Sequence, residues 1–161
     1  MIIVDNCILS SLSKIDHLEL LKHFKDVRTT NGVIQEIFRS EMDEIISPVS
    51  SSLQKWLFLV SCNDYSCVHE LQKNNIKLSF VDCELIIACK DNGAILFSDD
   101  TRLINAAEME YNVKTFDLCD ILCALKKRNR ITPDGIEQII LKLKRKDHYS
   151  FKPPSLELLR S

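Results

Sequence analysis

Short apolar runs alternate with amphipathic stretches along most of the chain. The runs are rich in β-branched or aromatic residues and short enough to be buried strands, at 2–4, 27–30, 57–62, 94–97 and 113–116. Apolar residues at helical spacing predict helices between and after them, at 13–24, 33–38, 47–56, 78–91, 101–111, 117–125 and 132–145. Buried strands that alternate with helices predict an α/β fold, a three-layer sandwich with a central, mainly parallel, twisted sheet flanked by helices.

Particular residues predict where the helices begin and end. Ser13 is a candidate cap for the first helix, and Pro48 is expected in the first turn of the third. Gly93 is expected to end the helix at 78–91. Asp117 and Thr132 are expected to cap the last two helices.

The length of 161 residues fits one domain with one core. We expect this domain to span residues 1–147, with its motifs in 1–125 and an extra C-terminal helix at 132–146. Residues 148–161 contain two adjacent prolines, which predict an extended C-terminal arm.

Hydropathy and cysteine usage indicate the compartment. No apolar run approaches the roughly 18–20 residues of a membrane span, so we expect a cytoplasmic protein without membrane contact. The seven cysteines include no C-x-x-C pair, and most lie in apolar helical patterns, which is typical of buried free thiols in a reducing compartment. The nearest zinc-like spacings, at 62/67 and 119/123, do not form a paired zinc frame.

Glycine and charge exclude some functions and leave others open. The three glycines form neither a P-loop nor a G-x-G-x-x-G motif, so P-loop NTPases and Rossmann dehydrogenases are excluded. The net charge of -2 argues against binding nucleic acid through bulk positive charge. That charge is unevenly divided, because residues 1–113 carry a net -7 and residues 114–161 a net +5.

The basic third of the chain allows two interpretations. Lys126, Lys127 and Arg128 follow one helix and a second basic group ends the next. Such residues are typical of helix C-termini and solvated faces. Alternatively, they flank an acidic cleft and hold the backbone of single-stranded or structured RNA.

Acidic side chains follow two of the predicted strands. Asp5 follows the strand at 2–4, and Asp99 and Asp100 follow the strand at 94–97. Parallel sheets bind ligands at the carboxyl ends of their strands, where the strand order reverses. Each of these acids also fits ordinary turn or helix capping.

Helical phase distinguishes the acids of the predicted helices. Asp82 lies inside the apolar stripe of the helix at 78–91, where an ionised carboxylate needs a partner, a proton or a metal. Glu84 lies off that stripe and is expected to be solvated or at its rim, and Glu36 lies on the flank of its helix. Several carboxylates that converge in one cleft would favour Mg²⁺ or Mn²⁺ over zinc.

Four stretches of the chain resemble the PIN-domain family in order and spacing. They are IIVDNCIL at 2–9, VIQEI at 33–37, LSFVDCELIIAC at 78–89 and ILFSDDTRLINAA at 95–107. The later part, including ALKKRNRI at 124–131, is similar to prokaryotic VapC-like toxin ribonucleases. The resemblance implies a divalent-metal-dependent endoribonuclease, often the toxin of a type II toxin-antitoxin pair.

The resemblance also implies roles for individual residues. The catalytic acids that it implies are Asp5, Glu36, Asp82 and Asp100. The implied metal ligands are Asp5, Asp82 and Asp100, with Asp99 as an additional ligand. Ser98, Asn6 and the basic residues Lys126, Lys127 and Arg128 are the candidate substrate contacts. Cys7 departs from the family, because Ser or Thr often stands two residues after the first acid.

Other functions and partners stay open at this point. The alternative function is a non-catalytic PIN-like module that binds RNA or protein, which Cys7 favours and the four acids oppose. An Asp-based phosphotransfer domain is disfavoured, because residues 5–7 do not form the D-x-D motif. The resemblance further implies a small antitoxin and a homodimer, for which the expected contacts are exposed leucines at 156, 158 and 159.

Overall fold

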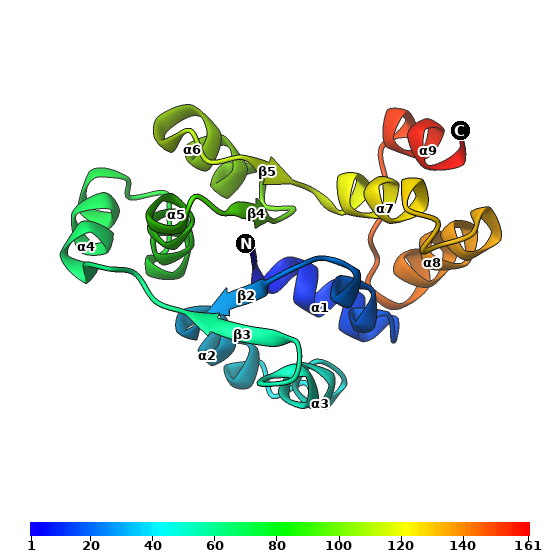
Figure 1. Ribbon diagram of the computed structural model, residues 1–161, viewed down its shortest axis with the longest axis horizontal. Helices are drawn as coiled ribbons and strands as arrows, with labels where there is room; N and C mark the ends of the chain where they lie inside the picture. The colour runs from blue at the N-terminus through cyan, green and yellow to red at the C-terminus, as the bar shows by residue number, and fades with distance from the viewer.

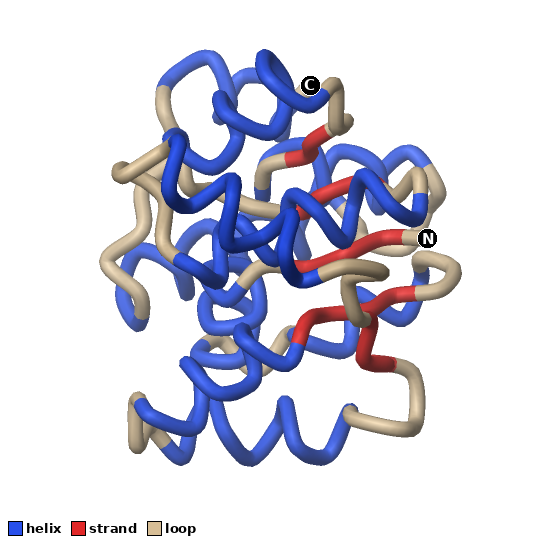
Figure 2. The backbone as a smooth tube through the Cα atoms, turned by 90° about the vertical axis from the view of Figure 1, so that its left-hand side faces the viewer, coloured by secondary structure: helices blue, strands red, loops and turns tan.

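A five-stranded parallel sheet forms the centre of the protein, which is described over residues 1–161 by a computed structural model. The strand order is β3-β2-β1-β4-β5, and every neighbouring pair is parallel. Figure 2 shows the strands one above another in a single layer. Their bounds are β1 Ile2–Val4, β2 Val27–Thr30, β3 Leu57–Val60, β4 Ile95–Phe97 and β5 Thr115–Phe116.

Helices cover both faces of this sheet, which confirms the predicted three-layer α/β sandwich. Helices α4, α5 and α6 lie on one side, and α1, α3, α7, α8 and α9 lie on the other (Figure 1). No helix combines the length and the hydropathy needed to cross a membrane. The bounds are α1 Asn6–Lys14, the 3-10 helix η1 Leu18–His23, α2 Asn31–Arg39, α3 Asp43–Ser52, α4 Tyr65–Asn74, α5 Phe80–Asn92, α6 Thr101–Tyr111, α7 Leu118–Lys127, α8 Pro133–Lys146 and α9 Pro153–Arg160.

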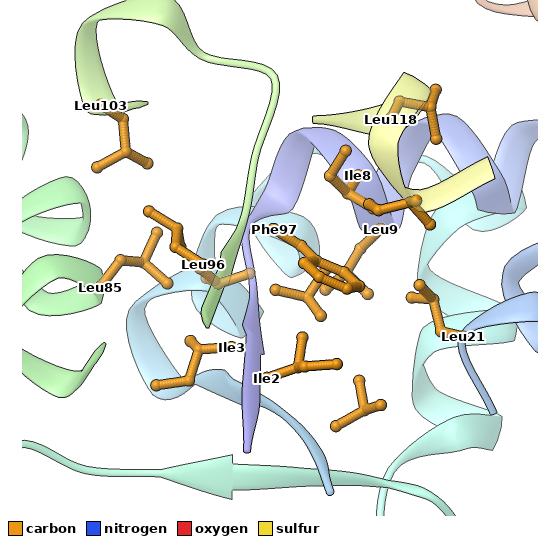
Figure 3. Packing of buried hydrophobic residues seen from close by; sticks show 14 of the residues in the cluster. Ile2, Ile3, Ile8, Leu9, Leu21, Leu85, Leu96, Phe97, Leu103 and Leu118 are labelled. Carbon is orange, nitrogen blue, oxygen red and sulfur yellow. The ribbon is translucent and has the colours of Figure 1, made fainter. Parts of the chain in front are cut away.

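The hydrophobic core fills both spaces between sheet and helices. Phe97 of β4 is almost completely buried and makes an edge-to-face contact with Phe24, with ring centroids 5.1 Å apart. Leu85 and Leu103 pack on one face of β4, and Ile8 of α1 packs on the other (Figure 3). The carboxyl ends of β1 and β4 are therefore held between two packed layers.

Several predicted helix boundaries are confirmed. Gly93 ends α5 in the left-handed conformation, with φ of 57°. Asp117 forms a capping box with Asp120 at the start of α7. The Thr132 side chain accepts the N–H of Gly135 at the start of α8.

Two predictions for the first half of the chain are wrong. The first helix begins at Asn6 rather than near Ser13, because the Asp5 side chain caps it directly after β1. Pro48 lies inside α3 rather than in its first turn. The carbonyl that loses its partner there belongs to exposed Glu44, which can bond water instead. The sequence pattern also misses α4, because only Val68 and Leu71 of that helix are buried.

The predicted extended arm is also wrong, because its last part is the helix α9. The two prolines occupy the first turn of α9, where their missing N–H groups are tolerated. Leu159 is 1% exposed and therefore is not a free contact for a partner, whereas Leu158 is 62% exposed. The Lys126 ammonium donates to the Leu159 carbonyl over 2.9 Å, and this bond attaches α9 to α7.

Candidate active site

The strand order reverses next to the central strand β1. The chain runs from β1 outward through β2 and β3, and then returns to place β4 on the other side of β1. The N–H of Asp5 donates to the Phe97 carbonyl over 2.9 Å, so the residues after β1 and β4 lie side by side. This is the position at which parallel sheets bind their ligands.

Asp5 lies at this position with both carboxylate oxygens engaged. Its Oδ1 accepts the N–H of Asn6 over 2.6 Å. Its Oδ2 accepts the Ser98 hydroxyl over 2.7 Å and the Cys7 thiol over 3.1 Å. Burial raises the pKa of Asp5 above its ordinary value, and the negative charge of Asp82 raises it further, while the three hydrogen bonds oppose the shift.

Cys7 occupies the position where the resemblance leads us to expect a hydroxyl. Its thiol donates to Asp5, and its sulfur accepts the N–H of Asp99 over 3.2 Å. Burial raises the pKa of the Cys7 thiol well above its ordinary value, so the thiol stays protonated. The thiol therefore performs both hydrogen-bonding roles that a hydroxyl would have in this place.

Glu36 approaches the same site from α2. Its Oε2 accepts the side-chain amide of Asn6 over 3.4 Å, a long contact, and the Ser10 hydroxyl donates to Asn6 Oδ1 over 2.7 Å. Partial burial raises the pKa of Glu36, and the charges of Asp5 and Asp82 add to that increase. The charge of Asp82 is thus near enough to affect the pKa of both Asp5 and Glu36.

The two acids of α5 differ in burial from the prediction that placed Asp82 inside the apolar stripe and Glu84 in solvent or at its rim. Asp82 is only half-buried, and its carboxylate accepts the N–H of Ser79 over 2.8 Å as part of a capping box. Glu84, which was expected to be solvated, is 2% exposed. The prediction from helical phase failed because α5 is buried on more than one face. It packs against the sheet and against the helices α2, α4 and α6.

Glu84 connects α5 to two other helices. Its Oε2 accepts the N–H of Gly32 at the start of α2 over 3.1 Å, and its Oε1 accepts the Tyr65 hydroxyl at the start of α4 over 2.9 Å. Gly32 and Glu36 are four residues apart and therefore lie on the same face of α2. Glu84 fixes the start of the helix that carries Glu36.

Asp99 and Asp100 lie beside the site but have local partners. Asp100 caps α6 by accepting the N–H groups of Arg102 and Leu103 over 2.8 and 3.2 Å. Asp99 accepts the N–H of Leu118 over 2.9 Å at the start of α7. Burial raises the pKa of Asp99, and the charge of Asp117 also raises it.

The three basic residues at the end of α7 differ in availability. Lys126 is half-buried and bonded to α9, as described above. Arg128 is exposed and lies over the Phe24 ring, 5.3 Å from its centroid. Lys127 is exposed and has no ion pair.

Comparison with known proteins identifies the fold family. The family model described as a PIN domain matches residues 1–159, nearly the whole chain. The chain belongs to the PIN-domain family. PIN domains are generally nucleases, and the match continues through α9. No curated protein and no solved structure matches the chain.

PIN domains typically use divalent metal ions, and the acids of this PIN domain fit such an ion in their chemistry. Asp5, Glu36 and Asp82 supply only carboxylate oxygens, which Mg²⁺ and Mn²⁺ prefer. Burial raises the pKa of Asp5 and Glu36, and the charge repulsion that adds to this increase would be relieved by a cation. In the described conformation, however, no three His, Cys, Asp or Glu side chains converge closely enough to hold a metal.

Sequence reasoning missed the residues around Glu84. The signal was present, because α5 is apolar on nearly all sides between Cys83 and Cys89, and a helix of that kind is buried all round. A carboxylate inside such a helix needs donors from neighbouring elements. Tyr65, one of those donors, had no signal of its own because α4 was not predicted.

Proposed function

We propose that this PIN-domain protein is an endoribonuclease that hydrolyses RNA phosphodiester bonds with the help of Mg²⁺ or Mn²⁺. The observation that supports the proposal most is the electrostatic proximity of Asp5, Glu36 and Asp82 where the strand order reverses, although their side chains do not converge on one point in the described conformation. Asp5 and Asp82 also cap α1 and α5, but capping does not require these acids and Glu36 to lie near one another, where their charges repel. A role in binding cations explains why the protein keeps these carboxylates close together despite their charge repulsion.

Each acid has a distinct part in the proposal. Asp5 and Asp82 would hold the ion, and Glu36 would either hold it or accept a proton from a water molecule. The bound ion would supply a more acidic water and neutralise charge on the phosphate. Asp100, and Asp99 as an additional ligand, would have to exchange their present helix-capping bonds for this role.

Ser98 and Asn6 complete the proposed centre. Ser98 is buried and orients Asp5, so its contribution is to positioning. Asn6 has an amide that reaches Glu36 and is half-buried, which allows it to donate to a phosphate oxygen instead.

The backbone of RNA could extend from the acids along α7. The N-terminus of α7 bonds Asp99, and Lys127 lies nine residues further along, which is roughly 14 Å at 1.5 Å per residue. Lys127 and Arg128 are the exposed members of the basic group, so phosphate contacts are assigned to them. Lys126 contributes to the stability of α9 instead.

We also propose a toxin role for this nuclease, with a small antitoxin protein as its inhibitor and a second copy as its partner. The similarity of residues 124–131 to VapC-like toxins supports this role. It is tested by expressing the protein alone and together with the product of the adjacent open reading frame. Growth arrest that the neighbour relieves supports a toxin, and unimpaired growth contradicts it.

Cleavage of a labelled single-stranded RNA tests the nuclease itself. We expect products with Mg²⁺ or Mn²⁺, none with EDTA, and a loss of at least about 100-fold in Asp5→Asn and Asp82→Asn. Asp134→Asn is the matched control, because Asp134 is an exposed acid in the first turn of α8. Cleavage in EDTA, or full activity of Asp5→Asn, would contradict the proposal.

Calorimetry distinguishes the enzyme from a non-catalytic module. Titration of the wild-type protein with Mn²⁺ should release or absorb heat that disappears in Asp5→Asn. A protein that binds RNA but neither binds Mn²⁺ nor cleaves would be a PIN-like binding module.

A further inference from the structure

An exposed aromatic cluster lies on the neighbouring helices α4 and α5, at the end of α5 that carries Asp82. It consists of Tyr65, His69 and Phe80. The Tyr65 and Phe80 rings are nearly parallel, with an interplanar angle of 13° and centroids 6.5 Å apart. The His69 and Phe80 centroids are 5.2 Å apart. Figure 1 shows α4 and α5 side by side at one end of the molecule.

Phe80 packs against the core, but the core does not explain the exposed parts of the cluster. Tyr65 is 38% exposed, His69 is exposed and Phe80 is half-buried, although α4 has Val68 and Leu71 to pack against α5. Apolar side chains that cluster on a surface, unlike single exposed ones, can mark a binding site. The cluster therefore presents ring surface to the solvent next to an acid of the candidate active site.

The Tyr65 ring is held in place rather than free to turn. Its hydroxyl donates to Glu84, which is 2% exposed and also accepts the N–H of Gly32. The same carboxylate therefore fixes the aromatic ring and the start of α2, which carries Glu36. A ring fixed before binding loses little conformational freedom when a planar ligand stacks on it.

The exposed side chains around the cluster are of both signs, with Asp64 and Glu70 in the same segment as two lysines that can meet phosphates. His69 and Lys73 follow Tyr65 at intervals of four residues, so the three lie along one face of α4. Lys77, in the connection between α4 and α5, is also exposed. Aromatic rings next to lysines are typical of surfaces that bind single-stranded nucleic acids, where bases stack and phosphates meet ammonium groups.

We propose that Tyr65 and Phe80, with His69 beside them, form a stacking subsite for an unpaired base of the RNA strand that the acidic site cleaves. The proposal rests on the proposed function for the identity of the strand. The subsite holds a base on the α4 side of Asp82, and α7 holds phosphates on the other side of the sheet. It favours unpaired RNA over a duplex, because only an unstacked base offers both faces to side chains.

Binding of two labelled oligomers in EDTA, without cleavage, tests the subsite. One is a twelve-residue oligouridylate, and the other is an abasic ribose-phosphate chain of the same length. We expect the wild-type protein to bind the oligouridylate more tightly, and Tyr65→Leu and Phe80→Leu to lose about 5- to 150-fold of that affinity. Binding of the abasic chain should not change.

Two controls separate loss of stacking from other effects. Tyr65→Phe keeps the ring and should retain most of the preference for bases. Phe58→Leu removes another exposed ring, 43% exposed on the edge strand β3, and should change neither affinity. Equal binding of both oligomers by the wild-type protein, or unchanged binding by Tyr65→Leu and Phe80→Leu, would overturn the proposal.

Photo-crosslinking of the wild-type protein gives a test that needs no substitution. An oligouridylate that contains 5-iodouridine should crosslink to the peptide with Tyr65 or Phe80, and crosslinks found only elsewhere would overturn the subsite. The two proposals fail separately. Base-dependent binding without cleavage in Mg²⁺ would support the stacking subsite and contradict the nuclease function. Cleavage that stays unchanged in Tyr65→Leu and Phe80→Leu would support the nuclease function and contradict the subsite.

Discussion

Substitution of Gly32 by alanine should destabilise the protein through one buried carboxylate. A Cβ atom at position 32 would clash with Glu84 Oε2 and lie 3.0 Å from Val81 Cγ2. Glu84 is 2% exposed and cannot swing into solvent. Its bond from the Gly32 N–H must therefore break or lengthen, and its bond from Tyr65 is disturbed with it.

Two opposing terms set the magnitude of this effect. A hydrogen bond to a charged group contributes about 1.5–3 kcal/mol to stability. Alanine in a helix gains about 1 kcal/mol over glycine. We expect a net loss of about 1 kcal/mol in the free energy of unfolding, which lowers Tm by about 2–4 °C in a chain of this length. Circular dichroism melting measures that shift.

A double-mutant cycle tests the reasoning directly. In a Glu84→Ala background the clash with the carboxylate is absent and only the 3.0 Å contact with Val81 Cγ2 remains, so Gly32→Ala should be less destabilising than in the wild type, or stabilising by up to about 1 kcal/mol through helix propensity. Gly135→Ala in α8 is the control, because its Cβ would meet only the Ile131 and Thr132 side chains, and its Tm should stay the same or rise. If Gly32→Ala lowered Tm equally with and without the Glu84 carboxylate, the reasoning would be refuted.

Three further predictions concern the site and its surroundings. Because burial raises the pKa of Asp5, its ionisation lowers stability as pH rises through the folded pKa; Asp5→Asn removes this loss, so the Tm of the variant relative to the wild type should be higher at pH 7 than at pH 4 in EDTA. Cys7→Ser should leave Tm and any RNA cleavage almost unchanged, whereas Cys7→Ala should lower the free energy of unfolding by about 1 kcal/mol, measured by urea denaturation. Lys126→Met should free α9 for limited proteolysis with little effect on the salt dependence of RNA binding, and Lys127→Met should reduce that dependence without loosening α9.

The carboxyl edge of the sheet could be predicted from sequence because its rules are local. Asp5 and Ser98 directly follow short apolar runs, and parallel strands bring such positions together whatever the helices do. The caps at Gly93 and Thr132 are equally local, since each depends on one or two bonds within a single turn.

The environment of the acids in α5 could not be predicted in this way. Phase assumes one buried stripe on a helix, and α5 is enclosed on several sides. Asp82 lies in the first turn, where its carboxylate folds back to Ser79 as a cap. The partners of Glu84 come from α2 and from α4, a helix with too few apolar positions to give a periodic signal.

The bond between Ser98 and Asp5 joins residues 93 positions apart, and this separation has a consequence for the order of events during synthesis. β1 can complete its central place only after β4 exists, so the acidic edge cannot assemble on a nascent chain that ends before residue 97. Asp99 then gains its bond from Leu118 only when α7 has begun to form. Pairing between such distant segments requires closure of a long loop and slows folding. More than half of the chain must therefore be synthesised before the bond between Ser98 and Asp5 can form.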